Sequence, residues 1–323
     1  MLIFNKQQGK KMKGMKQLIV AATLAFGSVT AQAAEECKQV NFADVGWTDI
    51  TATTAMTSVV LEALGYAPKT QLLSVPVTYK SLANGDLDIF LGNWMPTMEA
   101  DIRPYLDDKT VEVVGKNLEG AKYTLAVPSY VAEAGVKSFA DIAKNADKFD
   151  GRIYGIEPGN DGNRLIQDMI DKNAFGLEGF KVVESSEAGM LSQVKRSVKR
   201  EDWIVFLAWE PHPMNANFEL TYLDGGDDFF GPNYGGATVY TNIRSGLMNE
   251  CQNLGALLKN LQFSLAMENE VMGAILDEKK DPEVAASEWM KSNFSEIEKW
   301  LQGVNTIDGK PAVPALKKHL KLM

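Results

Sequence analysis

The sequence predicts an α/β fold with two lobes and a cleft between them. Three observations support this prediction. Strand-like and helix-like segments alternate along most of the chain, the alternation restarts near residue 122, and residues 90–98 and 206–214 carry two similar motifs. Such alternation is typical of a mostly parallel sheet covered by helices.

The first round of alternation covers residues 40–91. Apolar runs predict strands at 40–45, 72–75 and 87–91. Helices are predicted between them at 50–64 and 78–83. Glycine follows each helix, as expected where a helix ends in a left-handed residue.

The second round covers residues 123–208. Its predicted strands are 123–127, 154–156, 180–183 and 203–208, and its predicted helices are 138–145, 164–172 and 188–199. The glycine-rich stretch 224–236 then leads to a strand at 238–242 and to helices without strands of their own, which we expect to complete the first lobe.

This order predicts two crossovers between the lobes, one near residue 120 and one near 225–235. The predicted organisation is a signal peptide at 1–33, the first lobe at 34–121, the second lobe at 122–230 and a return to the first lobe at 231–323. Two crossovers around a cleft are the layout of a hinged solute-binding protein.

The two similar motifs are FLGNWMPTM at 90–98 and FLAWEPHPM at 206–214. Each is an apolar run that reaches a tryptophan and then a proline, which cannot extend a strand because it lacks the N–H donor. Trp94 and Trp209 are therefore predicted at strand ends, where ligands collect in open parallel sheets.

Four other residues are expected at the same face. Trp47, Asp49 and Asn160 follow predicted strands, and Tyr123 lies at the start of the predicted strand 123–127. Each has a plain structural explanation by itself. A tryptophan can fill a core, Asp49 can cap a helix, and Asn160 can suit a left-handed turn. Their gathering at one face is the argument for a site.

Several aromatic faces around one point suit a cation without hydrogen-bond donors. A quaternary ammonium group fits this description, and choline is a standard ligand of aromatic cages. Asp49 would neutralise the charge and accept a hydrogen bond from a hydroxyl group. A betaine would need donors for its carboxylate, and only Lys122 and Arg164 lie near these positions in the sequence.

The N-terminus predicts export. Lysines precede the apolar stretch 18–29, and Ala31-Gln32-Ala33 offers a signal-peptide cleavage site. Residues 1–33 hold five lysines and no acidic residue, so their removal leaves 28 basic against 42 acidic residues, a net charge of −14. This charge disfavours nucleic acid and anionic membranes as partners. We expect a periplasmic monomer.

The chain has two cysteines, Cys37 and Cys251. In an exported protein such a pair favours a disulfide over two free thiols, and the bridge would bring the last third of the chain beside its start. Two cysteines and two histidines without ligand-like spacing do not predict a metal site. We expect no cofactor.

The chain resembles the periplasmic choline-binding proteins of ABC importers, within the quaternary-amine (glycine betaine/proline type) substrate-binding family. The most specific stretches are VGWTDI at 45–50, LANGDLDIFLGNWMPTM at 82–98, IEPGNDGN at 156–163 and FLAWEPHPM at 206–214. The resemblance implies the periplasmic binding protein fold of the type II-like class, with ligand in the interlobe cleft.

The resemblance also implies roles for single residues. An aromatic box would consist of Trp47, Trp94, Tyr123 and Trp209, with Asp49 beside it. Asp49 and Asn160 would contact the choline hydroxyl, and Cys37 would pair with Cys251.

These inferences predict a receptor that binds choline and delivers it to an ABC permease, without catalysis. Acetylcholine would be a weaker ligand. A glycine betaine or carnitine receptor of the same fold is the nearest alternative. A secreted hydrolase of choline esters is a further one, but it would need a nucleophile with a base, and only His212 lies near the predicted cleft.

Overall fold

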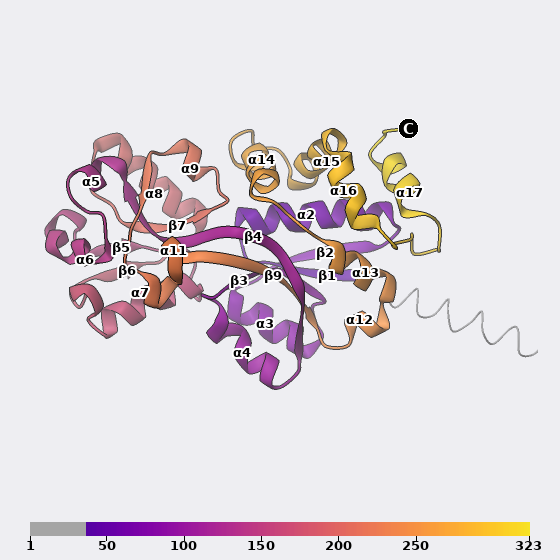
Figure 1. Ribbon diagram of the computed structural model, residues 1–323, viewed down its shortest axis with the longest axis horizontal. Helices are drawn as coiled ribbons and strands as arrows, with labels where there is room; N and C mark the ends of the chain where they lie inside the picture. The colour runs from indigo at the N-terminus through magenta and orange to yellow at the C-terminus, as the bar shows by residue number, and fades with distance from the viewer. Residues whose placement is uncertain (1–36) are drawn as a thin grey trace, which may run out of the picture.

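The computed structural model describes residues 37–323. The predicted signal peptide, residues 1–33, lies outside the described residues. Within the described part of the chain, nine strands form one sheet with helices on both faces (Figure 1). The strands are β1 (Gln39–Asp44), β2 (Ala67–Leu72), β3 (Ile89–Met95), β4 (Val111–Pro128), β5 (Arg152–Tyr154), β6 (Lys181–Val183), β7 (Phe206–Glu210), β8 (Leu220–Tyr222) and β9 (Gly236–Arg244).

The sheet has a parallel group at each end and antiparallel strands in the middle. Its order is β2-β1-β3-β9-β4-β7-β5-β6, and β8 pairs with β4. β1 is parallel to β2 and β3, and β5 is parallel to β6 and β7. We call the end with β1 to β3 the first lobe and the end with β5 to β7 the second lobe.

The long strands β4 and β9 connect the lobes. They run antiparallel across the middle of the molecule in Figure 1. β4 pairs with β9 from Val111 to Lys122 and with β7 from Lys122 to Ala126. The predicted strand 123–127 is therefore only the second half of β4, because its first half is polar and partly exposed and shows no apolar run.

The helices fill the connections between strands and the C-terminal third. The α-helices are α2 (Thr48–Ala63), α3 (Val75–Asn84), α4 (Glu99–Asp107), α5 (Ser129–Glu133), α6 (Phe139–Ile142), α7 (Asp161–Asp171), α8 (Glu187–Arg200), α9 (Met214–Asn217), α10 (Asp227–Phe230), α11 (Pro232–Gly235), α12 (Leu247–Glu250), α13 (Gln252–Asn260), α14 (Leu265–Leu276), α15 (Pro282–Ser292), α16 (Phe294–Glu298) and α17 (Ala312–His319). Three 3₁₀ segments are η1 (Ala143–Phe149), η2 (Ala174–Gly176) and η3 (Lys299–Leu301).

The C-terminal helices return to the first lobe. α14, α15 and α17 pack against α2, which is buried along most of its length. Figure 1 shows these helices above β1 and β2, while α3 and α4 lie on the other side of the sheet. The buried α2 matters for the site because two predicted ligand-binding residues lie at its start, Trp47 directly before the helix and Asp49 in its first turn.

The segment 72–75 differs from its prediction as a strand. β2 ends at Leu72, and α3 begins at Val75 after the extended residue Ser74. Pro76 suits the first turn of a helix because its missing N–H needs no partner there. β2 itself is an exposed edge strand that contains Pro68, and such an edge tolerates proline and polar residues.

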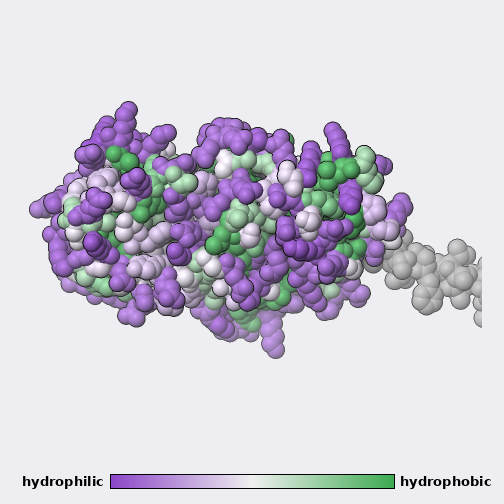
Figure 2. All heavy atoms as spheres, turned by 45° about the horizontal axis from the view of Figure 1, so that its top comes forward, coloured by the Kyte–Doolittle hydropathy of each residue, from purple (hydrophilic) through white to green (hydrophobic). Residues whose placement is uncertain are grey.

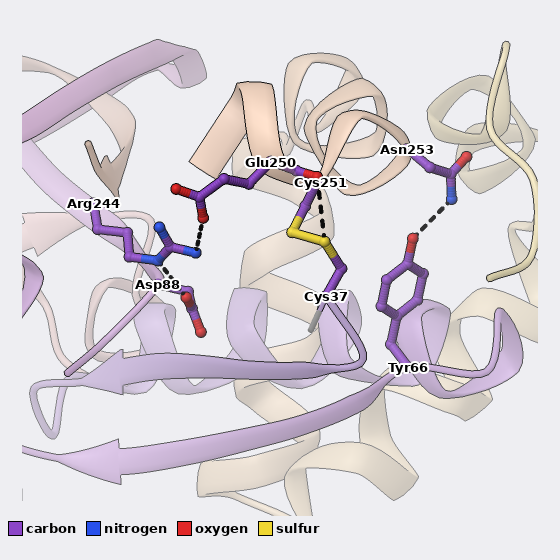
Figure 3. Close-up of a disulfide and its surroundings, with 7 residues drawn as sticks. All are labelled: Cys37, Tyr66, Asp88, Arg244, Glu250, Cys251 and Asn253. Atoms are coloured by element: carbon purple, nitrogen blue, oxygen red, sulfur yellow. Dashed lines mark hydrogen bonds and ion pairs between the residues drawn. A yellow bond between two sulfur atoms is a disulfide. The ribbon is translucent and has the colours of Figure 1, made fainter. Parts of the chain in front are cut away.

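The predicted disulfide between Cys37 and Cys251 is confirmed (Figure 3). It joins positions 214 residues apart in the sequence, since Cys37 lies just before β1 and Cys251 directly follows α12. Beside it, the Arg244 guanidinium contacts Asp88 at 2.8 Å and Glu250 at 2.6 Å. The C-terminal third is thus fixed to the first lobe next to β1.

Hydrophilic side chains cover most of the face seen in Figure 2, with hydrophobic residues scattered between them. Each lobe has its own buried aromatic residues, such as Phe42 and Tyr79 in the first and Phe139 and Phe206 in the second. Among residues 37–323, no helix combines the length and the apolar character that a membrane span requires.

Candidate functional site

A small cavity lies between the two lobes. The space free of protein atoms there is about 260 Å³, which includes space open to solvent, and the lining residues are Trp47, Asp49, Trp94, Tyr123, Ile156, Asp161 and Trp209. Five of the six predicted ligand-binding residues thus line one cavity. All seven wall residues are at least nine-tenths buried.

The first lobe supplies three of the residues that line the cavity. Trp47 is the last residue before α2, and Asp49 lies in the first turn of that helix. Trp94 is the second-to-last residue of β3, and proline follows the strand. The approach of α2 to β3 is close, because a Cβ at Gly92 would lie 2.7 Å from the Ile50 side chain.

The second lobe supplies the opposing rings. Tyr123 on β4 and Trp209 on β7 are directly paired in the antiparallel ladder. Trp209, like Trp94, is the second-to-last residue of its strand and is soon followed by a proline. Gly162 makes room for the phenol, since a Cβ there would lie 2.1 Å from the Tyr123 hydroxyl.

The rings stand edge to face around Tyr123. Its centroid lies 6.1 Å from that of Trp94 and 6.2 Å from that of Trp209, with interplanar angles of 61° and 78°. Rings at these angles present faces as well as edges to the space between them. The negative face of each ring attracts a cation placed in that space.

Two indole N–H groups fix their rings through carboxylates. Trp47 Nε1 donates to Glu157 Oε1 at 2.8 Å, across the two lobes. Trp94 Nε1 donates to Asp49 Oδ2 at 3.1 Å, within the first lobe. Burial raises the pKa of Glu157 to about 7.

Asp49 has an oxygen without a partner. The residue is 2% exposed, and its Oδ1 makes no hydrogen bond to the described residues. Burial, followed by the charge of Glu187, raises the pKa of Asp49 to about 8. A positive group that binds beside this buried carboxyl group would favour its ionised form and interact with its open oxygen.

Asp161 is a second carboxylate on the cavity wall, and sequence reasoning missed it. It is fully buried, its Oδ2 has no hydrogen-bond partner among the described residues, and burial raises its pKa to about 6. It is the first residue of α7, in the IEPGNDGN stretch. The signal was its position next to Asn160, on the loop that follows β5.

Asn160 lies behind the wall rather than on it. Its Oδ1 accepts hydrogen bonds from the Tyr123 hydroxyl at 2.9 Å and from the backbone N–H of Asn163 at 3.1 Å. Its Nδ2 donates to Asp161 Oδ1 at 3.1 Å. Asn160 thus caps α7 and holds two wall residues in place. Ile156 is the other wall residue that the sequence did not single out.

The cations near the site are engaged elsewhere. Lys122 lies 3.3 Å from Glu210, and Arg164 lies 2.6 Å from Asp101. Neither residue lines the cavity. Among the described residues, no group of three or more His, Cys, Asp or Glu side chains could hold a metal ion. The cavity therefore offers aromatic faces and two carboxyl groups.

Comparison with known proteins agrees with this architecture. A family model described as the substrate binding domain of ABC-type glycine betaine transport system matches residues 38–292. The glycine betaine/carnitine transport binding protein of Listeria monocytogenes is 30% identical over 157 residues, which are 49% of this chain and 51% of that protein.

Two solved structures are more similar over a greater length. An ABC-transporter choline binding protein in complex with choline matches with a TM-score of 0.88. An ABC-transporter choline binding protein in an unliganded semi-closed conformation matches with a TM-score of 0.82. Both are 64% identical in sequence, and both comparisons cover 88% of this chain and 99% of the other.

These matches confirm the predicted α/β fold of a two-lobed periplasmic binding protein. The higher TM-score to the choline complex indicates that this structure is nearer to the ligand-bound form than to the semi-closed form. The chain belongs to the family of substrate-binding domains of ABC-type glycine betaine transport systems.

Proposed function

We propose that this protein captures choline between its two lobes and delivers it to an ABC importer. The observation that carries the proposal is the cavity itself. Four aromatic rings from both lobes and two carboxyl groups face one small space, and each carboxyl group has an oxygen without a hydrogen-bond partner in the described part of the chain. The proposal assigns the aromatic box to Trp47, Trp94, Tyr123 and Trp209.

The chemistry of choline fits these walls. Its trimethylammonium group cannot donate hydrogen bonds and is too large for a tight salt bridge, so aromatic faces bind it best, at about 2 kcal/mol for a desolvated contact. Its hydroxyl can donate one hydrogen bond. Asp49 Oδ1 and Asp161 Oδ2 are the acceptors that this site leaves open.

This supply of acceptors favours choline over glycine betaine. A betaine carries a carboxylate that would need donors, yet the Trp47 and Trp94 indole N–H groups already donate to protein carboxylates. The Tyr123 hydroxyl donates to Asn160. A ligand carboxylate would also lie near Asp49 and Asp161, where like charges repel at low dielectric.

We assign Asn160 an indirect part in binding. The resemblance implies that it contacts the choline hydroxyl, but here its side chain is committed to Tyr123, Asn163 and Asp161. We therefore propose that Asn160 orients the Tyr123 ring and the Asp161 carboxylate. Acetylcholine shares the headgroup of choline but lacks its hydroxyl, so we expect weaker binding.

The mechanism is closure of the lobes upon the ligand. Each lobe holds part of the box, so the closed state gains contacts that the open state lacks, and choline shifts the equilibrium between the two. We propose lobes formed by residues 34–121 with 231–323 and by residues 122–230. We further propose a periplasmic monomer, exported through residues 1–33, that docks on the permease.

We propose that no reaction accompanies binding. A hydrolase needs a base with access to its nucleophile. The His212 ring is 1% exposed, its Nδ1 accepts the backbone N–H of Met214 at 2.9 Å, and its Nε2 lies 3.2 Å from Glu187. Both ring nitrogens are thus occupied. Turnover of acetylcholine by the purified protein would contradict this part of the proposal.

Calorimetric titration tests the ligand assignment. Choline and glycine betaine are titrated separately into the same ligand-free preparation. We expect choline to bind at least tenfold more tightly, which corresponds to about 1.4 kcal/mol. Tighter binding of glycine betaine would instead assign the protein as a betaine receptor.

A further inference from the structure

A buried carboxylate outside the aromatic box joins the two lobes. Glu187 is the first residue of α8 in the second lobe, and Thr48 is the first residue of α2 in the first lobe. Glu187 Oε2 accepts the Thr48 backbone N–H at 2.8 Å, and Glu187 Oε1 accepts the Thr48 hydroxyl at 2.5 Å. Both residues are buried.

We propose that Glu187 is a positioning residue that clasps the start of α2 and holds Trp47 and Asp49 in the closed binding geometry. This inference rests on the proposed function. Thr48 lies directly between Trp47 and Asp49 in the sequence, so its two hydrogen bonds to Glu187 fix the backbone that carries both residues. Because the bonds span the lobes, opening of the cleft breaks both of them.

We call the two hydrogen bonds between Glu187 and Thr48 the clasp. His212 contacts Glu187 from within the second lobe. Since its Nδ1 accepts the Met214 N–H, the ring proton resides on Nε2, which points at Glu187 Oε1 at 3.2 Å. The imidazole also packs against the Trp209 ring, with centroids 4.9 Å apart. Glu187 therefore links the Trp47–Asp49 segment of one lobe to Trp209 of the other.

The clasp gains strength from its charge and its burial. Hydrogen bonds to an ionised carboxylate are about twice as strong as those between neutral groups. The free N–H groups at the start of α2 also favour a negative charge there. A glutamine at position 187 would accept only one of the two Thr48 hydrogen bonds, because its NH₂ group would face the other Thr48 donor.

The clasp also makes closure depend on the ligand. Burial, followed by the charge of Glu187, raises the pKa of Asp49, so ionisation of Asp49 in the empty closed state is opposed by repulsion from Glu187. A quaternary ammonium group in the box offsets this repulsion. Choline is therefore expected to favour the clasped state beyond its contacts with the rings.

The test compares Glu187→Gln with the wild type and with Glu178→Gln, which removes the same charge from an exposed position of the second lobe. Stopped-flow fluorescence gives the association and dissociation rates of choline. Small-angle X-ray scattering with saturating choline reports closure. We expect about tenfold faster dissociation for Glu187→Gln, little change in the association rate and incomplete closure, while Glu178→Gln behaves as the wild type.

A second variant covers the case in which Glu187→Gln does not fold. Thr48→Val removes the hydroxyl but keeps the backbone N–H, so we expect a smaller rise in the dissociation rate. In the double variant the two effects should not add, because the Thr48 hydroxyl donates to Glu187 itself.

The outcomes separate the clasp from the proposed function. If Glu187→Gln and Thr48→Val bind and release choline at the rates of the wild type and close as fully, the proposed role of the clasp is wrong, but the proposed function stands. Failure of the wild type to bind choline would overturn the proposed function and the clasp with it.

Discussion

The indole N–H of Trp94 donates to one oxygen of Asp49 at 3.1 Å, and the other oxygen is buried without a hydrogen-bond partner among residues 37–323. One carboxylate thus both orients a ring of the box and presents an acceptor to the cavity. The same division occurs in the second lobe, where Asn160 holds one oxygen of Asp161 and leaves the other open. Each lobe therefore contributes aromatic rings and a carboxyl group, and closure brings them together.

The aromatic walls are expected to dominate affinity. Trp94→Ala or Trp209→Ala should each weaken choline binding at least tenfold, about 1.4 kcal/mol, because a desolvated cation–π contact is lost. Trp289→Ala is the matched control, since this indole lies on α15 and donates to Glu270, away from the cavity. Calorimetry measures all three, and wild-type affinity in both box variants would show that the box is misplaced.

The second carboxylate should determine charge preference. Asp161→Asn keeps the shape of the wall but removes a charge, so we expect about tenfold weaker choline binding and a smaller ratio of choline to glycine betaine affinity. Asp168→Asn on the same helix serves as the control because its side chain is exposed beside Lys172. An unchanged ratio in Asp161→Asn would remove Asp161 from the specificity argument.

Choline affinity should rise with pH. Burial, with a further contribution from Glu187, places the pKa of Asp49 at about 8 in the empty site. The cation favours the ionised form and lowers this pKa, so binding releases a proton below pH 8 and affinity increases until the pH passes the free-state value. Burial raises the pKa of Asp161 to about 6, which acts in the same direction.

Calorimetry in buffers of different ionisation enthalpy measures this proton release at pH 7. The Asp49→Asn variant should show a much weaker pH dependence. Equal choline affinity of the wild type from pH 6 to 9 would contradict the linkage.

The disulfide should stabilise the first lobe without contributing to the cavity. A bridge between residues 214 apart restricts a long loop of the unfolded chain, and loop entropy sets its contribution at up to about 5 kcal/mol. The Cys37→Ser, Cys251→Ser double variant should unfold at lower urea concentration and still bind choline at 25 °C. An unchanged unfolding free energy would contradict this prediction.

The sequence predicted most of the buried strands and five of the residues that line the cavity. Short apolar runs that end in Trp-x-Pro or Trp-Glu-Pro predict a strand end, and the structure agrees with that expectation at both Trp94 and Trp209. The edge strand β2 and the first half of β4 were missed because they are polar and exposed, so hydrophobic periodicity gives no signal there.

The partners of the site residues could not be predicted from local patterns. The open oxygen of Asp161 and the bond between Glu187 and Thr48 depend on how the lobes meet, and the latter joins positions 139 residues apart. The partner of Asn160 could not be predicted from local patterns either. Its loop was identified, but its hydrogen bond to Tyr123 follows from the placement of α7 against β4.

A crystal structure of the choline complex tests the central claim most directly. We expect the choline nitrogen within roughly 6 Å of the ring centroids of Trp47, Trp94, Tyr123 and Trp209, with the hydroxyl group hydrogen-bonded to Asp49 or Asp161. Choline bound outside the aromatic box would contradict the account. A closed box that contains no choline would contradict it as well.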